Sequence, residues 1–243
     1  MQIRLNKFLA NLGLVSRRKA DALIDEGKVL LNSSKARLGD KIDPSKDKLS
    51  VDGRAVELTS ETEFEYWLLN KPSQVISSVS DEAGRKTVMD YFKNKTKARL
   101  YPVGRLDYDS EGLLLMTNDG ELAQHLTHPK FEVPKVYKVW VDGIYMPSKI
   151  ERLLRGVRLA EGRIAFDQVE LLEKEGREFT LRITIHQGVK REIRRACAKV
   201  GWTVTKLLRT EIANLKLLNL IPGNVRKLTV EEVQALRQSV GLT

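Results

Sequence analysis

The segment from Gly104 to Gly120 carries the residues whose types and spacing could do chemistry. It reads GRLDYDSEGLLLMTNDG, with Asp107 directly behind an arginine and a leucine, and with Asp109 and Glu111 at the next alternate positions. Three roles are open: the carboxylates hold a metal ion, they stabilise a turn, or one of them attacks a substrate. A lone carboxylate beside arginines stays ionised, which suits a nucleophile or an electrostatic stabiliser. Composition alone favours the structural role, an Asp–Arg pair.

A metal site is not expected. The acids of this segment imitate the start of a calcium loop, but the twelfth position, where that loop needs a glutamate, is Asn118. His125 and His128 have no further His or Cys nearby to complete a zinc site. Cys197 falls on the apolar side of an expected helix, so it is a poor candidate nucleophile.

Positive charge is concentrated in a short part of the chain. The 243 residues carry a formal charge of +10, and between His186 and Arg209 seven basic residues stand against Glu192 alone. A charge run is often just a solvated face, but one without balancing acids indicates contact with RNA or DNA.

Residues 1–60 are predicted to form a small αα-β domain. Apolar side chains at helical spacing predict a helix over residues 5–12, which Gly13 ends. Ser16 is placed to cap a second helix that runs to Gly27. Short strands are expected at 28–32 and 48–58, and a polar linker at 59–65.

The basic triplet Arg17, Arg18 and Lys19 stands at the start of the second helix. Cations there oppose the helix macrodipole, so the triplet suits a phosphate contact better than it suits helix stability. A solvated helix face remains the alternative.

Residues 61–243 are predicted to form a larger domain in which helices and strands alternate irregularly. Several strands follow one another directly, which favours an α+β fold over a parallel α/β sheet. A capping box at Thr229 and Glu232 predicts a C-terminal helix. The expected strands lie at 66–70, 135–143, 166–174, 177–188 and 202–217, and further helices near 86–92, 121–128, 148–157 and 190–201.

Location in the cytoplasm, away from any membrane, is expected. No apolar run approaches the roughly 20 residues that a membrane-spanning helix needs. The first residues are interrupted by charged and amide side chains, unlike a signal peptide. A single cysteine cannot form an internal disulfide, which fits a reducing compartment.

The segment GRLDYDSEGLLLMTNDGELAQHLTHP resembles the signature of the ribosomal RNA pseudouridine synthases of the RsuA/RluB-type branch. The similarity extends to KPSQVISS, KVYKVWVDG, GVKREIRRACAKVG and PGNVRKLTVEEVQAL. The first 60 residues resemble the S-four-type RNA-binding domain that this branch carries in front. The resemblance implies an α+β fold in which this small domain precedes a catalytic domain with a mixed, mainly antiparallel sheet.

The resemblance also implies an activity. The enzyme would convert one uridine of ribosomal RNA into pseudouridine without metal or cofactor, as a monomer, and large-subunit RNA is favoured. Asp107 would be the catalytic aspartate, which adds to the sugar C1′ or removes the 2′ proton. Tyr137 would stack on the uracil, Arg194 would pair with the aspartate, and Arg105 and Lys71 would help to bind the substrate. RNA contacts are expected from Arg17, Arg18, Lys19, Lys190, Arg191 and Arg195.

Two positions depart from the family pattern. Gln74 stands where a glycine usually follows the KPx tripeptide, and the front domain reads LLNSSK in place of the usual VNG. A non-catalytic, ribosome-associated RNA-binding or assembly protein is the alternative function, and the modified uridine stays open.

Overall fold

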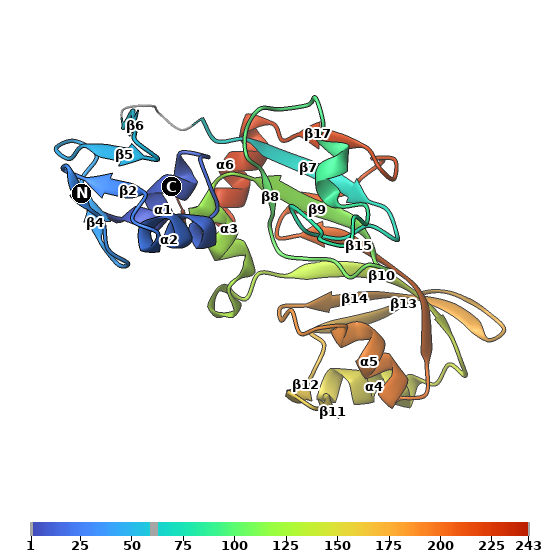
Figure 1. Cartoon of the computed structure of the whole chain (residues 1–243). Coiled ribbons are helices and arrows are strands. Elements are labelled where there is room, and N and C mark those ends of the chain that lie inside the picture. Colours follow the sequence, from blue (N-terminus) through green and yellow to red (C-terminus); the bar gives the residue numbers. More distant parts are fainter. Residues whose placement is uncertain (1, 59–62, 243) are drawn as a thin grey trace. The chain divides into compact units, whose positions relative to one another are not determined.

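The computed structural model describes residues 2–58 and 63–242 (Figure 1). The chain divides into two compact units, Met1–Glu65 and Tyr66–Thr243. The predicted boundary at residue 60 and most of the predicted linker fall on 59–62, outside the described residues. In the part of the chain that is described, no helix is long and apolar enough to cross a membrane.

The first unit packs two helices against short strands. Leu5, Phe8 and Leu9 of the first helix and Leu23 and Ile24 of the second are buried in its core. The helices are α1 (Leu5–Asn11) and α2 (Arg17–Asp25). The strands are β1 (Ile3–Arg4), β2 (Val29–Leu31), β3 (Ser34–Lys35), β4 (Lys41–Ile42), β5 (Leu49–Val51) and β6 (Arg54–Val56). β1 pairs with β4, and the other four form a sheet in the order β3-β2-β5-β6.

Local chemistry accounts for the ends of these elements. The Ser16 side chain accepts a hydrogen bond from the Lys19 backbone N–H, so the predicted cap of α2 is confirmed. Between β2 and β3 the chain turns through Asn32 and Ser33, whose φ angles are 50° and 67°. A two-residue hairpin turn with both residues in the left-handed region is the type that favours Asn followed by Gly. The second turn residue is therefore where this chain departs from the usual glycine.

The second unit is built on one nine-stranded mixed sheet. Its main order is β13-β14-β10-β15-β9-β7-β17, and only the β9–β15 pair is parallel. The α+β class and the mainly antiparallel sheet are thus confirmed. The strands are β7 (Tyr66–Lys71), β8 (Tyr101–Pro102), β9 (Glu111–Thr117), β10 (Lys135–Asp142), β13 (Gln168–Glu175), β14 (Glu178–Ile185), β15 (Thr203–Ile212), β16 (Leu215–Lys216) and β17 (Val225–Lys227), with a separate hairpin of β11 (Val157–Leu159) and β12 (Gly162–Ile164).

The sheet is covered on both faces. Along β9, Leu113 and Leu115 enter one core and Leu114 and Met116 the other, which is why this strand reads as a continuous apolar run. The first core packs against α3 (Gly120–Thr127) and α6 (Val230–Ser239), and the second against α4 (Pro147–Arg155), α5 (Glu192–Lys199) and the short 3-10 helix η1 (Val88–Tyr91).

One glycine makes the parallel pair possible. Gly112 of β9 has φ 105°, and a Cβ on it would collide with the Arg209 carbonyl of β15 and lie 2.8 Å from that residue's nitrogen. The backbones of β9 and β15 therefore approach each other closely at Gly112, five residues after Asp107, and only glycine fits there.

Two expected helices differ from the prediction. The helix expected near 86–92 is only η1, held by a capping box in which Thr87 and Asp90 exchange hydrogen bonds. The helix expected over 190–201 begins at Glu192, because Arg191 has φ 53° and ends the preceding loop in a left-handed conformation. Its predicted apolar side is confirmed, and burial raises the pKa of Cys197 to about 12, so its thiol stays protonated.

Candidate active site

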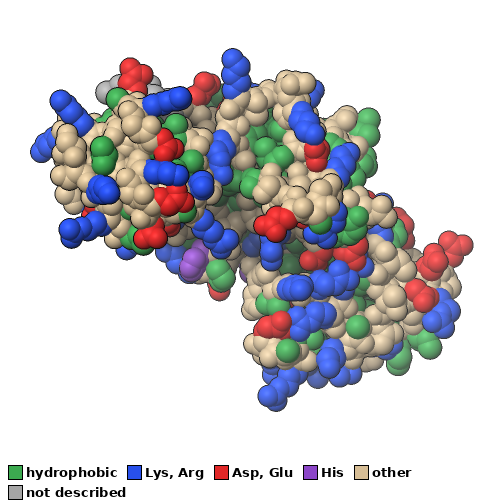
Figure 2. Space-filling view, viewed as in Figure 1, with side chains coloured by type: hydrophobic (Ala, Val, Ile, Leu, Met, Phe, Trp, Pro, Cys, Tyr) green, Lys and Arg blue, Asp and Glu red, His purple; other side chains and the backbone are tan. Residues whose placement is uncertain are grey.

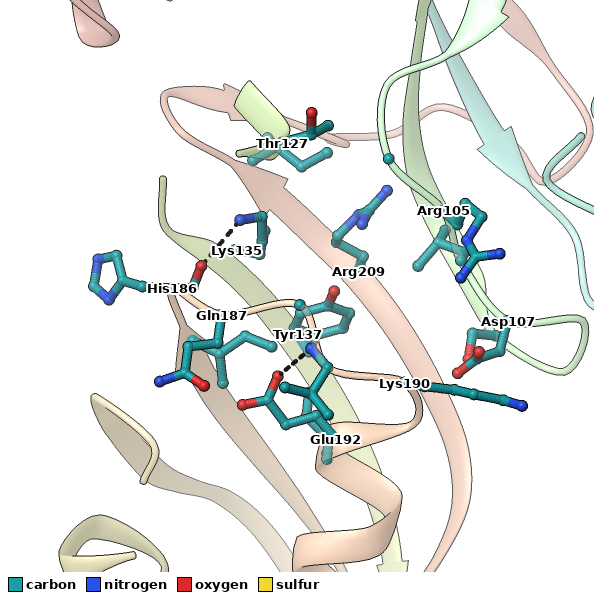
Figure 3. A pocket seen from close by; sticks show the side chains of 18 of the residues that line it. Arg105, Asp107, Thr127, Lys135, Tyr137, His186, Gln187, Lys190, Glu192 and Arg209 are labelled. Atoms are coloured by element: carbon teal, nitrogen blue, oxygen red, sulfur yellow. Dashed lines mark hydrogen bonds between the residues drawn. The ribbon is translucent and has the colours of Figure 1, made fainter. Parts of the chain in front are cut away.

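The second unit contains a cavity of about 850 Å³ that opens between the two centre strands β10 and β15 and two loops. Residues 103–110 form one wall and the loop 186–191 another (Figure 3). Of the residues that the sequence singled out, those that line this cavity are Arg105, Asp107, Tyr137, Lys190 and Arg191. The basic triplet of α2 belongs to the other unit.

Asp107 lies in a turn that the KPSQVISS segment holds from both sides. The Ser77 hydroxyl donates to the Leu106 carbonyl at 2.8 Å and accepts from the Leu106 N–H at 3.1 Å. The Gln74 N–H donates to the Tyr108 carbonyl at 2.7 Å. These bonds fix the backbone before and after Asp107, so the two motifs that the sequence showed separately form one structure.

The Asp107 side chain itself has no partner among the residues that the structure describes. It is partly exposed, and no side chain or backbone group of the described residues lies within hydrogen-bonding or ion-pairing distance of its carboxylate. Figure 3 shows this carboxylate at the edge of the cavity, close to Lys190. A carboxylate on a fixed backbone, with its oxygens unoccupied, can attack or stabilise a bound group.

The next acid along the turn is bound by two arginines. Arg191 donates two hydrogen bonds to the Asp109 carboxylate, at 2.9 and 3.1 Å. Arg194 Nη2 lies 3.4 Å from the same carboxylate and donates to the Asp109 carbonyl at 3.1 Å. Partial burial alone would raise the pKa of Asp109, but the Arg191 hydrogen bonds and the two positive charges lower it below its ordinary value.

This arrangement corrects the expected partner of Arg194. The sequence predicted a pair with Asp107, whereas the structure pairs Arg194 with Asp109. Its side chain is only 12% exposed, and Nη1 is held by the Val204 carbonyl at 2.8 Å, so the guanidinium is fixed between β15 and the turn. Arg194 does not line the cavity wall, and its contacts position the turn that carries Asp107.

Lys71 also occupies a different place from the one expected of a substrate-binding residue. It is 0% exposed at the end of β7, and its ammonium donates to the Pro72 and Val75 carbonyls, both at 2.8 Å. Burial lowers the pKa of Lys71 to about 8, although Glu111, Asp109 and Asp107 act to raise it. Through these two hydrogen bonds Lys71 holds the turn formed by residues 71–75, the KPSQV turn. Because its side chain is enclosed, it cannot reach a substrate in this conformation.

Two further basic residues, Lys190 just before α5 and Arg195 within it, differ in exposure. Lys190 is exposed at the cavity mouth. Arg195 donates two hydrogen bonds to Glu161, at 2.8 and 2.6 Å, and a third to the Lys190 carbonyl at 3.1 Å. An RNA phosphate would have to compete with Glu161 for this guanidinium.

Tyr137 and Arg209 lie side by side on the sheet that forms the cavity floor. Tyr137 of β10 is opposite Arg209 of β15, and both are buried yet line the cavity. Sequence reasoning missed Arg209 as a site residue, because it counted only toward a net charge. Its position directly after Leu207 and Leu208 in an expected strand was the available signal.

Two further titratable residues line the inner part of the cavity. Burial raises the pKa of Glu192, whose Oε2 accepts from the Val189 N–H and whose Oε1 has no partner among the described residues. Burial, together with the nearby Arg209 charge, lowers the pKa of Lys135 to about 8. Its ammonium donates to the Val133 and His186 carbonyls.

Known proteins resemble this chain over nearly its whole length. Residues 65–199 match the RNA pseudouridylate synthase family, and residues 3–47 match the S4 domain. The ribosomal large subunit pseudouridine synthase B of Bacillus subtilis is 46% identical over 237 residues, which cover 96% of this chain and 95% of that protein. The protein of the same name from Vibrio cholerae is 36% identical and covers 100% of this chain and 76% of its own length.

A solved structure agrees with these matches. The crystal structure of a pseudouridylate synthase aligns over 96% of this chain and 99% of its own, with 27% sequence identity and a TM-score of 0.69. The chain therefore belongs to the RNA pseudouridylate synthase family, and it is an RNA pseudouridine synthase, an isomerase, with an S4 domain in front of the catalytic unit.

Proposed function

We propose that this enzyme isomerises one specific uridine of large-subunit ribosomal RNA, with Asp107 as the catalytic residue. The observation that carries the assignment of Asp107 is its carboxylate, which lines the same cavity as Tyr137 and has no partner among the described residues. The choice of large-subunit RNA is supported by the names of the relatives from Bacillus subtilis and Vibrio cholerae.

The reaction begins with extrusion of the target nucleotide, because no side chain can reach the glycosidic bond inside a stacked helix. Asp107 then adds to the sugar C1′ or removes the proton from C2′. In either course the C1′–N1 bond breaks and its electron pair stays with the uracil, which leaves as an anion. The ionised carboxylate stabilises the positive character that develops on the sugar.

The second half of the reaction joins the same two fragments differently. The uracil turns, and its C5 forms the new bond to C1′ while the Asp107–C1′ bond breaks or, on the elimination course, while the proton returns from Asp107 to C2′. The proton on C5 is then removed and N1 gains a proton, so the product has the composition of the substrate. Tyr137 is the side chain proposed to stack on the base while it turns, because its ring is fixed in β10 at the cavity floor.

Exposed cations are proposed to hold the RNA outside the cavity. Arg105 and Lys190 stand at the cavity, and Figure 2 shows Lys and Arg side chains gathered over the region of α4, α5, β11 and β12. On the first unit, the three exposed residues at the start of α2 are proposed to contact phosphate: Arg17, Arg18 and Lys19.

A non-catalytic role as an RNA-binding assembly protein does not account for Asp107. A binder gains nothing from an ionised carboxylate without a partner at a surface that faces phosphates, since the two negative charges repel.

Mapping pseudouridine in both ribosomal RNAs of cells with and without this protein tests the proposal. We expect one pseudouridine of the large-subunit RNA to disappear and to return when the wild-type gene is restored. The Asp107→Asn gene should not restore it. Loss of a small-subunit pseudouridine, or no loss at all, would contradict the proposed substrate.

A further inference from the structure

Arg209 is a buried cation without a counter-ion in the described part of the chain. It is 4% exposed, and its Nε donates to the Leu113 carbonyl at 2.8 Å. No carboxylate of the described residues lies within ion-pairing distance of it, and its Nη2 is buried without a hydrogen-bond partner. Burying an arginine in this way is costly, and a buried polar group without a partner in a native protein calls for an explanation, of which a catalytic role is one.

The surroundings of Arg209 add positive charge instead of neutralising it. The Lys135 ammonium lies near enough for the two charges to affect each other, and the buried Lys71 is a third cation close to Arg209. Glu192 is the one acid that acts on Lys135 there, and its own carboxyl is buried. The inner cavity is therefore suited to a ligand that carries or develops negative charge.

The position of Arg209 indicates which part of the substrate it meets. Its strand neighbour is Tyr137, and Figure 3 shows the Tyr137 hydroxyl on the side of the ring that faces the Arg209 side chain, with Asp107 to one side of both. If Tyr137 stacks on the uracil and Asp107 meets the sugar, the guanidinium is placed at the base and not at the backbone phosphates. The Nε bond to β9 and the close β9–β15 approach at Gly112 keep it there.

We propose that Arg209 is a second catalytic residue, one that stabilises the uracil anion; this role rests on the proposed function. When the C1′–N1 bond breaks, the electron pair passes to N1 and the charge spreads to the carbonyl oxygens O2 and O4. The Nη groups of Arg209 donate hydrogen bonds to one of these oxygens, and no proton is transferred. A fixed donor in a site shielded from water acts more strongly on a developing charge than it would in bulk solvent.

Kinetics of the full-length protein on ribosomal RNA fragments test this role, with Arg209→Met and Arg209→Lys as variants. Arg209→Met should lower kcat at saturating RNA by about 10²–10³-fold, the usual loss when one such donor is removed, and leave Kd for the RNA within about twofold. Arg209→Lys keeps the charge but not the fork of donors, so its kcat should fall between those of Arg209→Met and wild type. Arg182→Met, on β14 of the same sheet and outside the cavity lining, is the matched control and should keep wild-type kcat.

The outcomes separate this inference from its alternatives. Wild-type kcat in the Arg209 variants overturns it, and so does weaker RNA binding with a salt slope about 0.7–0.9 smaller, which would mark a phosphate contact. If Arg209→Met does not fold, Arg209→Lys decides by the same kcat and Kd criteria. If the wild-type protein makes no pseudouridine in ribosomal RNA, the proposed function is wrong. If wild type and the Arg209 variants are equally active, only the role of Arg209 is wrong.

Discussion

Replacement of Asp109 by asparagine should destabilise the catalytic unit. The change keeps the size of the side chain but removes the charge that Arg191 and Arg194 share. Asparagine can accept one of the two Arg191 hydrogen bonds, and its amide would place N–H donors against a guanidinium. The turn that carries Asp107 would then be held to α5 less firmly.

The magnitude follows from the exposure of the partners. The Asp109 and Arg191 side chains are 42% and 40% exposed, so solvent screens their pair. Arg194 is mostly buried but keeps the Val204 and Asp109 carbonyls as acceptors. A half-exposed ion pair contributes up to about 1 kcal/mol and a hydrogen bond to a charged group somewhat more, so we expect a loss of about 1–2 kcal/mol.

Urea unfolding followed by tryptophan fluorescence measures this loss of stability in the second unit of the chain, where Asp109 lies. All three tryptophans of the chain, Trp67, Trp140 and Trp202, lie in the second unit. Asp142→Asn is the matched control, since its single contact with Arg177 at 3.3 Å is well exposed and should contribute less than about 0.5 kcal/mol.

The difference between wild type and Asp109→Asn should also depend on pH in one direction. The pKa of Asp109 is lower in the folded state than the unfolded value of about 3.9, so its stabilisation is complete at pH 7 and is lost as the pH falls through the folded pKa. The difference in the free energy of unfolding between the two proteins should begin to shrink below about pH 4 and should vanish below the folded pKa of Asp109. Two results would refute this account of the turn. One is an Asp109→Asn protein that is as stable at pH 7 as Asp142→Asn. The other is a difference in the free energy of unfolding between wild type and Asp109→Asn that persists in acid.

Three further changes test other parts of the structure. Gln74 has φ 62°, in the left-handed region that glycine adopts freely and a β-branched residue does not. Gln74→Gly should therefore raise the free energy of unfolding by up to about 1 kcal/mol in the same urea assay, whereas Gln74→Val should lower it by about 1–2 kcal/mol. Gly112→Ala should lose more than about 3 kcal/mol or fail to fold, because the new Cβ collides with the Arg209 backbone; a stable variant would contradict the close strand approach. Replacing the exposed α2 triplet Arg17, Arg18 and Lys19 by glutamine should weaken RNA binding and reduce the log–log salt slope by about 0.7–0.9 for each phosphate that the triplet neutralises, while an unchanged slope would remove the triplet from the RNA interface.

Much of the fold could be predicted because its signals are local. The Ser16 cap, the apolar face of α5 and the capping box at Thr229 each depend on residues within one or two helical turns, and each is confirmed. The resemblance in turn predicted the α+β class and the mainly antiparallel sheet.

The partners inside the site could not be predicted in the same way. The contact between Asp109 and Arg194 joins residues 85 positions apart, and which of two acids on one turn meets the arginine depends on how the turn is held. The enclosure of Lys71 and of Arg209 follows from strand order, because only the sheet places β15 against β9 and the KPSQV turn over the end of β7. The sequence pattern identifies such residues as charged, but the tertiary fold decides whether they face solvent, a carbonyl or a substrate.

Pseudouridine formation by purified Asp107→Asn protein tests the central claim most directly. The variant keeps the volume of the side chain and, since Asp107 has no partner among the described residues, it should unfold at the same urea concentration as wild type. It should bind the ribosomal RNA fragment with wild-type affinity or slightly more tightly, because a negative charge near the phosphates is removed. The account predicts no detectable pseudouridine from this folded, RNA-bound protein. A folded Asp107→Asn protein that still isomerises uridine at a near wild-type rate would contradict it.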